Sequence, residues 1–140
     1  MENPNLTFEV IERHEVQNVP DEIQILMDLV GLIDKHFRKQ RRPAFYAAAL
    51  SLKEASLNKL CIEVLRTTIY KLIQDKIHNE GVRLLMTTDW SIKHIALEIG
   101  CSDAAYFIRC FKKKTGFSPN RYRNSGAKLT YLEDLGEVIK

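Results

Sequence analysis

Apolar residues recur at steps of three and four through most of the chain, which is the spacing of an amphipathic α-helix. The first run starts at Asp21 and Gln24, a capping-box pair, and predicts a helix of about 17 residues. Later runs predict further helices at 43–50, 54–65, 69–86, 92–99, 103–116 and 119–123. Most of these runs begin near a Pro, Ser, Thr or Asp or end at a Gly, residues that are common at helix ends. The pattern therefore predicts an all-α fold with about seven helices.

The helical pattern weakens at both ends of the chain. Leu6, Phe8 and Val10 alternate with polar residues, which indicates a short strand or a loose arm. In the tail, Leu132, Leu135 and Ile139 stand at helical steps, but Gly136 interrupts them.

Two pairs of predicted helices repeat one another. Ala47 and Ala96 lie 49 positions apart, whereas Leu57 and Phe107 lie 50 apart, so the second pair carries one extra residue in its turn region. Each pair is a helix, a short turn and a second helix, with a small Ala on the inner side of the first helix. A helix-turn-helix needs such a small residue because its two helices cross closely. The alternative is a bundle of two unrelated helical hairpins.

The net charge of +3 hides an uneven distribution along the chain. Residues 1–34 hold one base and eight acids, whereas residues 35–123 hold 18 bases and seven acids. A basic middle of this kind favours a polyanionic partner such as double-stranded DNA. A solvated basic face without a partner is the alternative.

A helical wheel of residues 103–116 places an apolar stripe opposite a basic face. The inward side is expected to hold Ala104, Phe107, Cys110 and Phe111. The outward side holds Ala105, Arg109 and Lys112, flanked by Ile108 and Lys113. An α-helix fits the major groove, and acids on its outer face would meet phosphate, so the absence of acids there suits DNA binding.

The same construction on residues 54–65 gives a second candidate recognition helix. Its inward residues are expected to be Leu57, Leu60, Cys61 and Val64. Lys59 points outward with Ala55 and Ile62, and Asn58 lies at the flank. Asn can bond adenine through two hydrogen bonds, and Lys or Arg can contact guanine O6 and N7. For Asn58 the alternative is an ordinary solvated polar residue.

Other classes of function find no support in the sequence. Cys61, Cys101 and Cys110 lack CxxC spacing, and we expect all three to be packed, which argues against a cysteine alkyl acceptor. The histidines are scattered, no phosphate-binding loop or nucleophile elbow occurs, and we expect no metal, no cofactor and no enzyme activity. The N-terminus lacks a secretion signal and the longest apolar patch is too short to span a membrane, so we expect a cytoplasmic protein.

The second helix pair resembles the AraC/XylS family of bacterial transcription regulators. The likeness rests on SIKHIALEIGCSDAAYFIRCFKKKTGFSPNRYR, which is similar to the family signature of Ile-Ala, Gly, Tyr-Phe-x-Arg-x-Phe-Lys and Gly-x-Ser-Pro-x-x-Tyr-Arg. It covers roughly residues 22–123 and is weaker in the first pair. There Arg66 replaces the usual Gly, Ile69 the Pro, and Ser56 the aromatic, and in the second pair Cys101 replaces the usual Phe.

The resemblance implies two helix-turn-helix subdomains joined by a long central helix. The expected organisation is an N-terminal arm or remnant of an upstream domain at 1–21, a DNA-binding domain at 22–123 and a tail at 124–140. Within the domain, we expect the first subdomain at 22–67, the connecting helix at 68–86 and the second subdomain at 87–123. The chain is then either the C-terminal piece of a longer regulator, which would oligomerise through the upstream part, or a short activator that acts alone.

The resemblance also implies a set of DNA contacts, carried over by position. The base-reading residues would be Ala55, Asn58, Lys59, Ala104, Ala105, Ile108 and Arg109. Ala104, Ala105 and Ile108 are apolar, and we expect them to favour thymine methyl groups. We expect the phosphate contacts to fall to Arg41, Arg42, Ser102, Lys112, Lys113 and Arg121.

The sequence therefore predicts a sequence-specific DNA-binding transcription regulator, and the resemblance implies activation through contact with RNA polymerase. Arg123 is expected to pair with a nearby acid rather than to read DNA. The competing hypothesis is an adaptor that docks on polymerase or on a partner regulator without reading DNA, which the acidic residues 1–34 and the divergent first unit favour.

Overall fold

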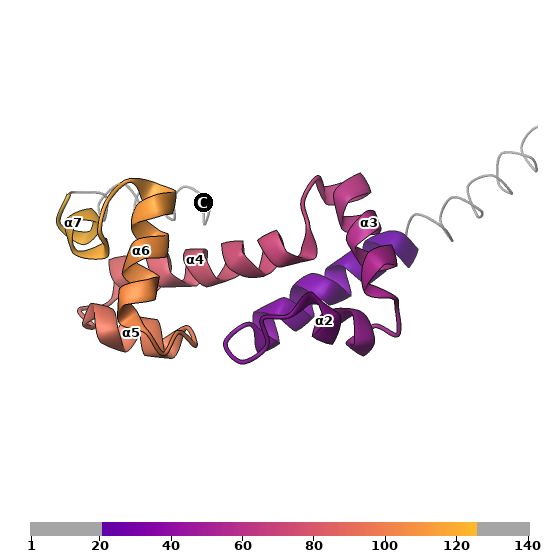
Figure 1. Ribbon diagram of the computed structural model, residues 1–140, viewed down its shortest axis with the longest axis horizontal. Helices are drawn as coiled ribbons and strands as arrows, with labels where there is room; N and C mark the ends of the chain where they lie inside the picture. The colour runs from indigo at the N-terminus through magenta and orange to yellow at the C-terminus, as the bar shows by residue number, and fades with distance from the viewer. Residues whose placement is uncertain (1–20, 126–140) are drawn as a thin grey trace, which may run out of the picture. The chain divides into compact units, whose positions relative to one another are not determined.

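The computed structural model describes residues 21–125, and all regular structure within them is helical (Figure 1). Helical backbone over 21–36 is followed by α2 (Pro43–Ala49), α3 (Glu54–Leu65), α4 (Ile69–Thr87), α5 (Ile92–Glu98), α6 (Ala104–Thr115) and α7 (Pro119–Asn124). The all-α prediction is confirmed, and the predicted bounds agree with these to within about a residue at each end. The alternation at Leu6–Val10 and the apolar steps of the tail lie outside the described residues.

The described chain forms two compact units, which we call unit 1 and unit 2. Unit 1 consists of residues 21–36 and 41–72, and unit 2 of residues 37–40 and 73–125. The division falls inside α4, so the first turn of this helix belongs to unit 1 and the remainder to unit 2.

The core of unit 1 is built from one stripe of each helix. Helix 21–36 buries Leu26, Leu29 and Ile33, which lie at three- and four-residue steps. The other fully or almost fully buried residues of this unit are Tyr46, Ala47, Leu57, Cys61 and Ile69. The predicted packing of Ala47 on the inner side of the first helix is thus confirmed.

The core of unit 2 is built around α4, α5 and the two phenylalanines of α6. Its buried apolar residues include Ile73, Leu85, Met86, Ile95, Ala96, Ile99, Phe107 and Phe111. Helix α4 runs through Gly81 without a break, and a Cβ at Gly81 would lie only 3.1 Å from Cε2 of Phe107. The glycine that weakens the helix in isolation therefore makes room for the Phe107 ring.

The internal repeat is confirmed element by element. Helices α2 and α5 have seven residues each and start 49 positions apart, whereas α3 and α6 have 12 residues each and start 50 apart. The backbone N–H of Leu52 donates to Ala47 O at 2.9 Å, and that of Cys101 donates to Ala96 O at 2.7 Å. The N-caps of α3 and α6 are Lys53 and Asp103, so the extra residue of the second turn is Ser102.

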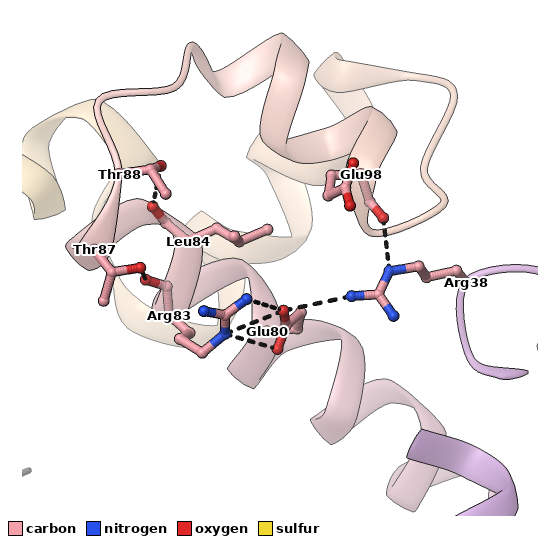
Figure 2. Close-up of polar contacts among 7 residues, drawn as sticks. All are labelled: Arg38, Glu80, Arg83, Leu84, Thr87, Thr88 and Glu98. Carbon is pink, nitrogen blue, oxygen red and sulfur yellow. Dashed lines mark hydrogen bonds and ion pairs between the residues drawn. The ribbon is translucent and has the colours of Figure 1, made fainter. Parts of the chain in front are cut away.

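A cluster of polar contacts around Arg38 and Glu80 joins residues 37–40 to the rest of unit 2 (Figure 2). Glu80 is only 9% exposed, accepts from Nε of Arg83 at 3.1 Å and pairs with Nη2 of Arg38 at 3.5 Å. The Arg38 Nε–H also donates to the backbone oxygen of Glu98 at 3.0 Å, near the end of α5. The hydrogen bond from Arg83, followed by the nearby positive charges, lowers the pKa of Glu80, although burial acts in the opposite direction.

Candidate nucleic-acid interface

Helix α6 is held in one orientation by a cap and by aromatic packing. Oδ1 of Asp103 accepts from the backbone N–H of Ala105 at 3.0 Å, and Gly116 ends the helix in left-handed backbone. Phe107 and Phe111 are buried, and the Phe111 ring lies 5.3 Å from the rings of both His78 and Tyr122. The face of α6 opposite these rings is therefore the face that solvent reaches.

This outward face of α6 carries the residues predicted to contact DNA. Ala105, Arg109, Lys112 and Lys113 are exposed, Ile108 is 36% exposed and Ala104 is half-buried. The Arg109 guanidinium lies 5.9 Å from the centre of the Tyr106 ring, which is itself exposed. The helix sequence contains no acid. Exposed bases on a helix without acids present a positive surface to phosphate or to base edges.

Two further phosphate candidates of unit 2 flank α6. Ser102 is exposed in the turn that precedes the helix. Arg121 is exposed on α7, and its guanidinium lies 5.4 Å from the centre of the Phe117 ring. Lys114 has a different environment, because its ammonium lies 2.6 Å from Oδ1 of Asp75. Unit 2 thus places Ser102, Lys112, Lys113 and Arg121 at its surface, which a phosphate contact requires.

Helix α3 of unit 1 presents a less basic surface than α6. Ala55 and Lys59 are exposed, and the Lys59 ammonium lies 4.0 Å from a carboxylate oxygen of Glu63. Asn58 is half-buried, and its Oδ1 accepts from the backbone N–H of Ile69 at 3.0 Å. Ahead of α2, Arg42 is exposed and Arg41 is half-buried.

The two units differ in charge. Among the described residues, unit 1 holds seven bases and six acids, and unit 2 holds eleven bases and five acids, so their net charges are +1 and +6. Electrostatic attraction to a polyanion is therefore concentrated in unit 2.

Some inward positions of the helical wheels are wrong. Val64 is 46% exposed and Leu60 is only half-buried on α3. On α6, Cys110 is exposed and Ala104 is half-buried, so the expectation that all three cysteines are packed holds only for Cys61 and Cys101. Leu60, Ala104 and Cys110 lie at the edges of their stripes, where the packing of the neighbouring helices decides burial. Val64 lies near the middle of its stripe, but it belongs to the last turn of α3, where its side chain lines an apolar groove.

Arg123 also differs from the expectation. Its Nε–H donates to the backbone oxygen of Leu85 at 3.0 Å, and Nη2 donates to that of Thr88 at 3.2 Å. These carbonyls lie in the last turn of α4 and just beyond it, where helix carbonyls lack intrahelical donors. Arg123 therefore pairs with backbone oxygens rather than with an acid. The sequence gives no signal for this partner, because the two segments are 35 or more positions apart.

Unit 1 has a second surface feature, an apolar groove of about 470 Å³. Helix 21–36 and the end of α3 line it, and several of its apolar side chains are 40–61% exposed: Ile23, Met27, Val30, Val64 and Leu65. The apolar spacing of helix 21–36 predicts that Ile23, Met27 and Val30 share one stripe with Leu26 and Ile33. This is wrong for the first three, which are exposed. Among residues 21–125 there is no cluster of potential metal ligands, and no helix there is long and apolar enough to cross a membrane.

Comparison with known proteins gives a consistent group of relatives. The protein family described as "Helix-turn-helix domain" matches residues 46–125, more than half of the 140-residue chain. The HTH-type transcriptional activator CsvR of Escherichia coli is 28% identical over 94 residues, which make up 67% of this chain and 35% of CsvR. The arabinose operon regulatory protein of Salmonella typhimurium is 31% identical over 105 residues, or 75% of this chain and 35% of that protein.

A solved structure agrees with the sequence relatives. The C-terminal domain of AraT, a response regulator from Geobacillus stearothermophilus, matches with a TM-score of 0.68 and 27% identity, covering 72% of this chain and 84% of that domain. The chain spans about a third of the length of the two curated relatives.

Proposed function

Because the chain belongs to the AraC/XylS family of helix-turn-helix transcription regulators, we propose that it reads two successive major-groove segments of a promoter, α3 in one and α6 in the other. The observation that carries the proposal is the two-sided character of α6. The side that carries Phe107 and Phe111 is buried, and the other side is exposed, basic and without acids. A rigidly held helix of this kind meets the requirements of major-groove binding.

We assign the base contacts of α6 by the chemistry of its exposed side chains. Arg109 takes guanine O6 and N7, and Ala104, Ala105 and Ile108 favour thymine methyl groups. In α3, the exposed Ala55 and Lys59 occupy the corresponding outward positions. This assignment accounts for Ala104, Ala105 and Ile108 of α6, whose side chains cannot form hydrogen bonds with a base.

Selection of binding sequences from a random DNA pool tests the base contacts. Arg109→Ala should relax the preference for guanine at one position and cost about 1–3 kcal/mol of binding free energy at the selected site. Arg121→Ala is the matched control, because loss of a phosphate contact should weaken all sequences about equally. An unchanged selected sequence in the Arg109 variant would refute its role in base reading.

Salt dependence tests the phosphate contacts. Ser102 is uncharged and does not contribute to the salt dependence. With about five charged contacts from Arg41, Arg42, Lys112, Lys113 and Arg121, log K should fall with log salt concentration with a slope of about −4.5. The double variant Lys112→Ala/Lys113→Ala should reduce the magnitude of this slope by about 2. Lys114→Ala is the control on the same helix, since its charge is already paired with Asp75. A wild-type slope near −1 would contradict the proposed contacts.

We further propose that the bound protein activates transcription by contact with RNA polymerase, in the cytoplasm where promoter DNA lies. The exposed apolar groove of unit 1 favours such a protein contact, because contiguous apolar surface commonly marks an interaction site. The same groove is the observation that favours the second candidate function, an adaptor that docks on polymerase or a partner regulator without specific DNA reading.

One pair of variants separates the regulator from the adaptor. Met27→Lys places a charge in the groove, and Leu97→Lys is the control at an exposed apolar residue of unit 2 outside it. A DNA-reading activator should keep its DNA affinity in Met27→Lys, as measured by fluorescence anisotropy, and lose activation of a reporter promoter. An adaptor should show no sequence-specific DNA binding in either variant or in the wild type.

A further inference from the structure

Two positions of the repeat hold a hydrogen-bond acceptor and its donor in unit 1, whereas the equivalent residues of unit 2 provide neither. Asn58 of α3 corresponds to Ile108 of α6, 50 positions later, and Ile69 corresponds to Pro119 at the same spacing. In unit 1, the Asn58 carbonyl accepts from the Ile69 N–H at 3.0 Å. In unit 2, Pro119 has no N–H and the side chain of Ile108 has no polar atom.

The Ile69 N–H needs a partner of this kind. Ile69 is fully buried, and it is the first residue of α4, where backbone N–H groups have no intrahelical acceptor. The Thr68 hydroxyl covers another of these groups, since Oγ1 accepts from the Lys71 N–H at 3.1 Å. Asn58 supplies the acceptor for Ile69 from a different helix and so joins the middle of α3 to the start of α4.

This hydrogen bond conflicts with the reading of a base by Asn58. To bond adenine through two hydrogen bonds, an Asn side chain must accept from N6 with its carbonyl oxygen while its amide group donates to N7. The Asn58 oxygen is already directed to a backbone N–H, and the side chain is half-buried. Turning it to a base would leave the buried N–H of Ile69 without its acceptor.

We propose that Asn58 is a positioning residue, which fixes the orientation of α3 through Ile69 and leaves the outward contacts of this helix to Ala55 and Lys59. Its role in orienting a recognition helix rests on the proposed function, whereas its hydrogen bond to α4 does not. The two repeats then differ at the first residue of the helix that follows the recognition helix. In unit 1 an amide oxygen accepts from the backbone N–H of this residue, and in unit 2 the residue is a proline, which has no N–H.

The midpoint of thermal unfolding, Tm, tests the proposal in two single variants of the full chain and in their double variant. Asn58→Leu removes the acceptor and should lower Tm by about 4–8 °C, the shift expected for loss of one helix cap in a domain of this size. Ile69→Pro removes the donor at a position where proline is tolerated. In the double variant, Asn58→Leu should cost at most about 2 °C relative to Ile69→Pro alone, because no N–H is left without a partner.

Selection of binding sequences distinguishes a positioning residue from a residue that reads a base, because only the loss of a base-reading residue should change the selected sequence. Asn58→Leu should bind more weakly but select the same sequence as the wild type, and the double variant should regain affinity for that sequence. A changed base preference in Asn58→Leu, or no recovery of affinity in the double variant, would assign Asn58 to base reading and overturn the proposal. An unchanged Tm in Asn58→Leu would overturn it as well.

The matched control is Ile108→Asn in unit 2. It places an amide opposite Pro119, which offers no N–H, and should therefore not raise Tm. A rise in Tm there would mean that an amide stabilises this site without the helix-start donor, against the proposal. If wild-type protein selects no DNA sequence, the proposed function fails, while the Tm cycle still decides whether Asn58 joins α3 to α4.

Discussion

Arg66 and Gly116 occupy equivalent places in the repeat, 50 positions apart, and both adopt left-handed backbone, with φ of 58° and 86°. Each ends its helix by donating its N–H to the carbonyl four residues earlier, Ile62 or Lys112. Glycine adopts this conformation without a Cβ penalty, whereas other L-residues pay for it. Unit 1 therefore carries backbone strain at a position where unit 2 carries none.

Arg66→Gly should stabilise unit 1. Relief of the left-handed strain is worth about 1 kcal/mol after the entropic cost of glycine in the unfolded chain is subtracted. Chemical denaturation monitored by circular dichroism measures the change. Arg66→Ala is the control, because it removes the same side chain and keeps the Cβ. Equal stability of the Gly and Ala variants would argue against strain at this position.

Gly100→Ala should strongly destabilise unit 2. Gly100 has φ of 85°, and a Cβ there would overlap the backbone carbonyl of Arg38. Strain of this kind costs about 1–3 kcal/mol, and the overlap adds to it. Gly31→Ala should do the reverse, since a Cβ at Gly31 meets nothing and alanine favours the helix by about 1 kcal/mol. Thermal denaturation of the two variants should therefore give shifts of opposite sign.

Arg121 and Arg123 should separate DNA affinity from stability, although they lie two positions apart. Arg123→Met removes the donors to Leu85 and Thr88 and should cost about 1 kcal/mol of stability. Arg121→Met should leave Tm nearly unchanged and reduce the magnitude of the salt slope of DNA binding by about 1. If Arg123→Met reduced the magnitude of the salt slope and left Tm unchanged, Arg123 would belong to the DNA contacts.

The stability of unit 2 should fall as the solution becomes acidic. Burial, and secondarily the charge of Lys114, lowers the pKa of His78, and Asp75 opposes them. Because the folded protein favours the neutral ring, this contribution is fully present above the unfolded pKa of about 6.5 and is lost as pH falls through the lower folded pKa. His78→Gln should flatten the decline in Tm at mildly acidic pH. An equally steep decline in His78→Gln would contradict this role of His78.

Much of the fold could be predicted from the chain because capping residues and apolar spacing act locally. The predicted range 54–65 is that of α3, and the helices predicted at 92–99 and 103–116 are α5 and α6, which Ser91 and Asp103 cap. Burial within the apolar stripes was less predictable. Burial of Val64 or Cys110 depends on where the neighbouring helices end, which residue spacing does not encode.

The candidate site could likewise be predicted only in part from the sequence. The exposure of Arg109 and Lys112 follows from the buried positions of Phe107 and Phe111 on the same helix. The partner of Asn58 does not follow from the wheel, because the donor belongs to another helix. A sequence signal for it nevertheless exists, in the joint exchange of Asn58 and Ile69 for Ile108 and Pro119 between the repeats.

The single additional residue at Ser102 has a consequence for protein engineering. Helices α3 and α6 have equal length, and the additional residue lies before α6. A cassette that begins with either helix, directly after Lys53 or Asp103, could therefore replace its counterpart without a change in the length of either turn. Chimaeras with two copies of one cassette would then show whether each half retains its own preference when its neighbour is replaced.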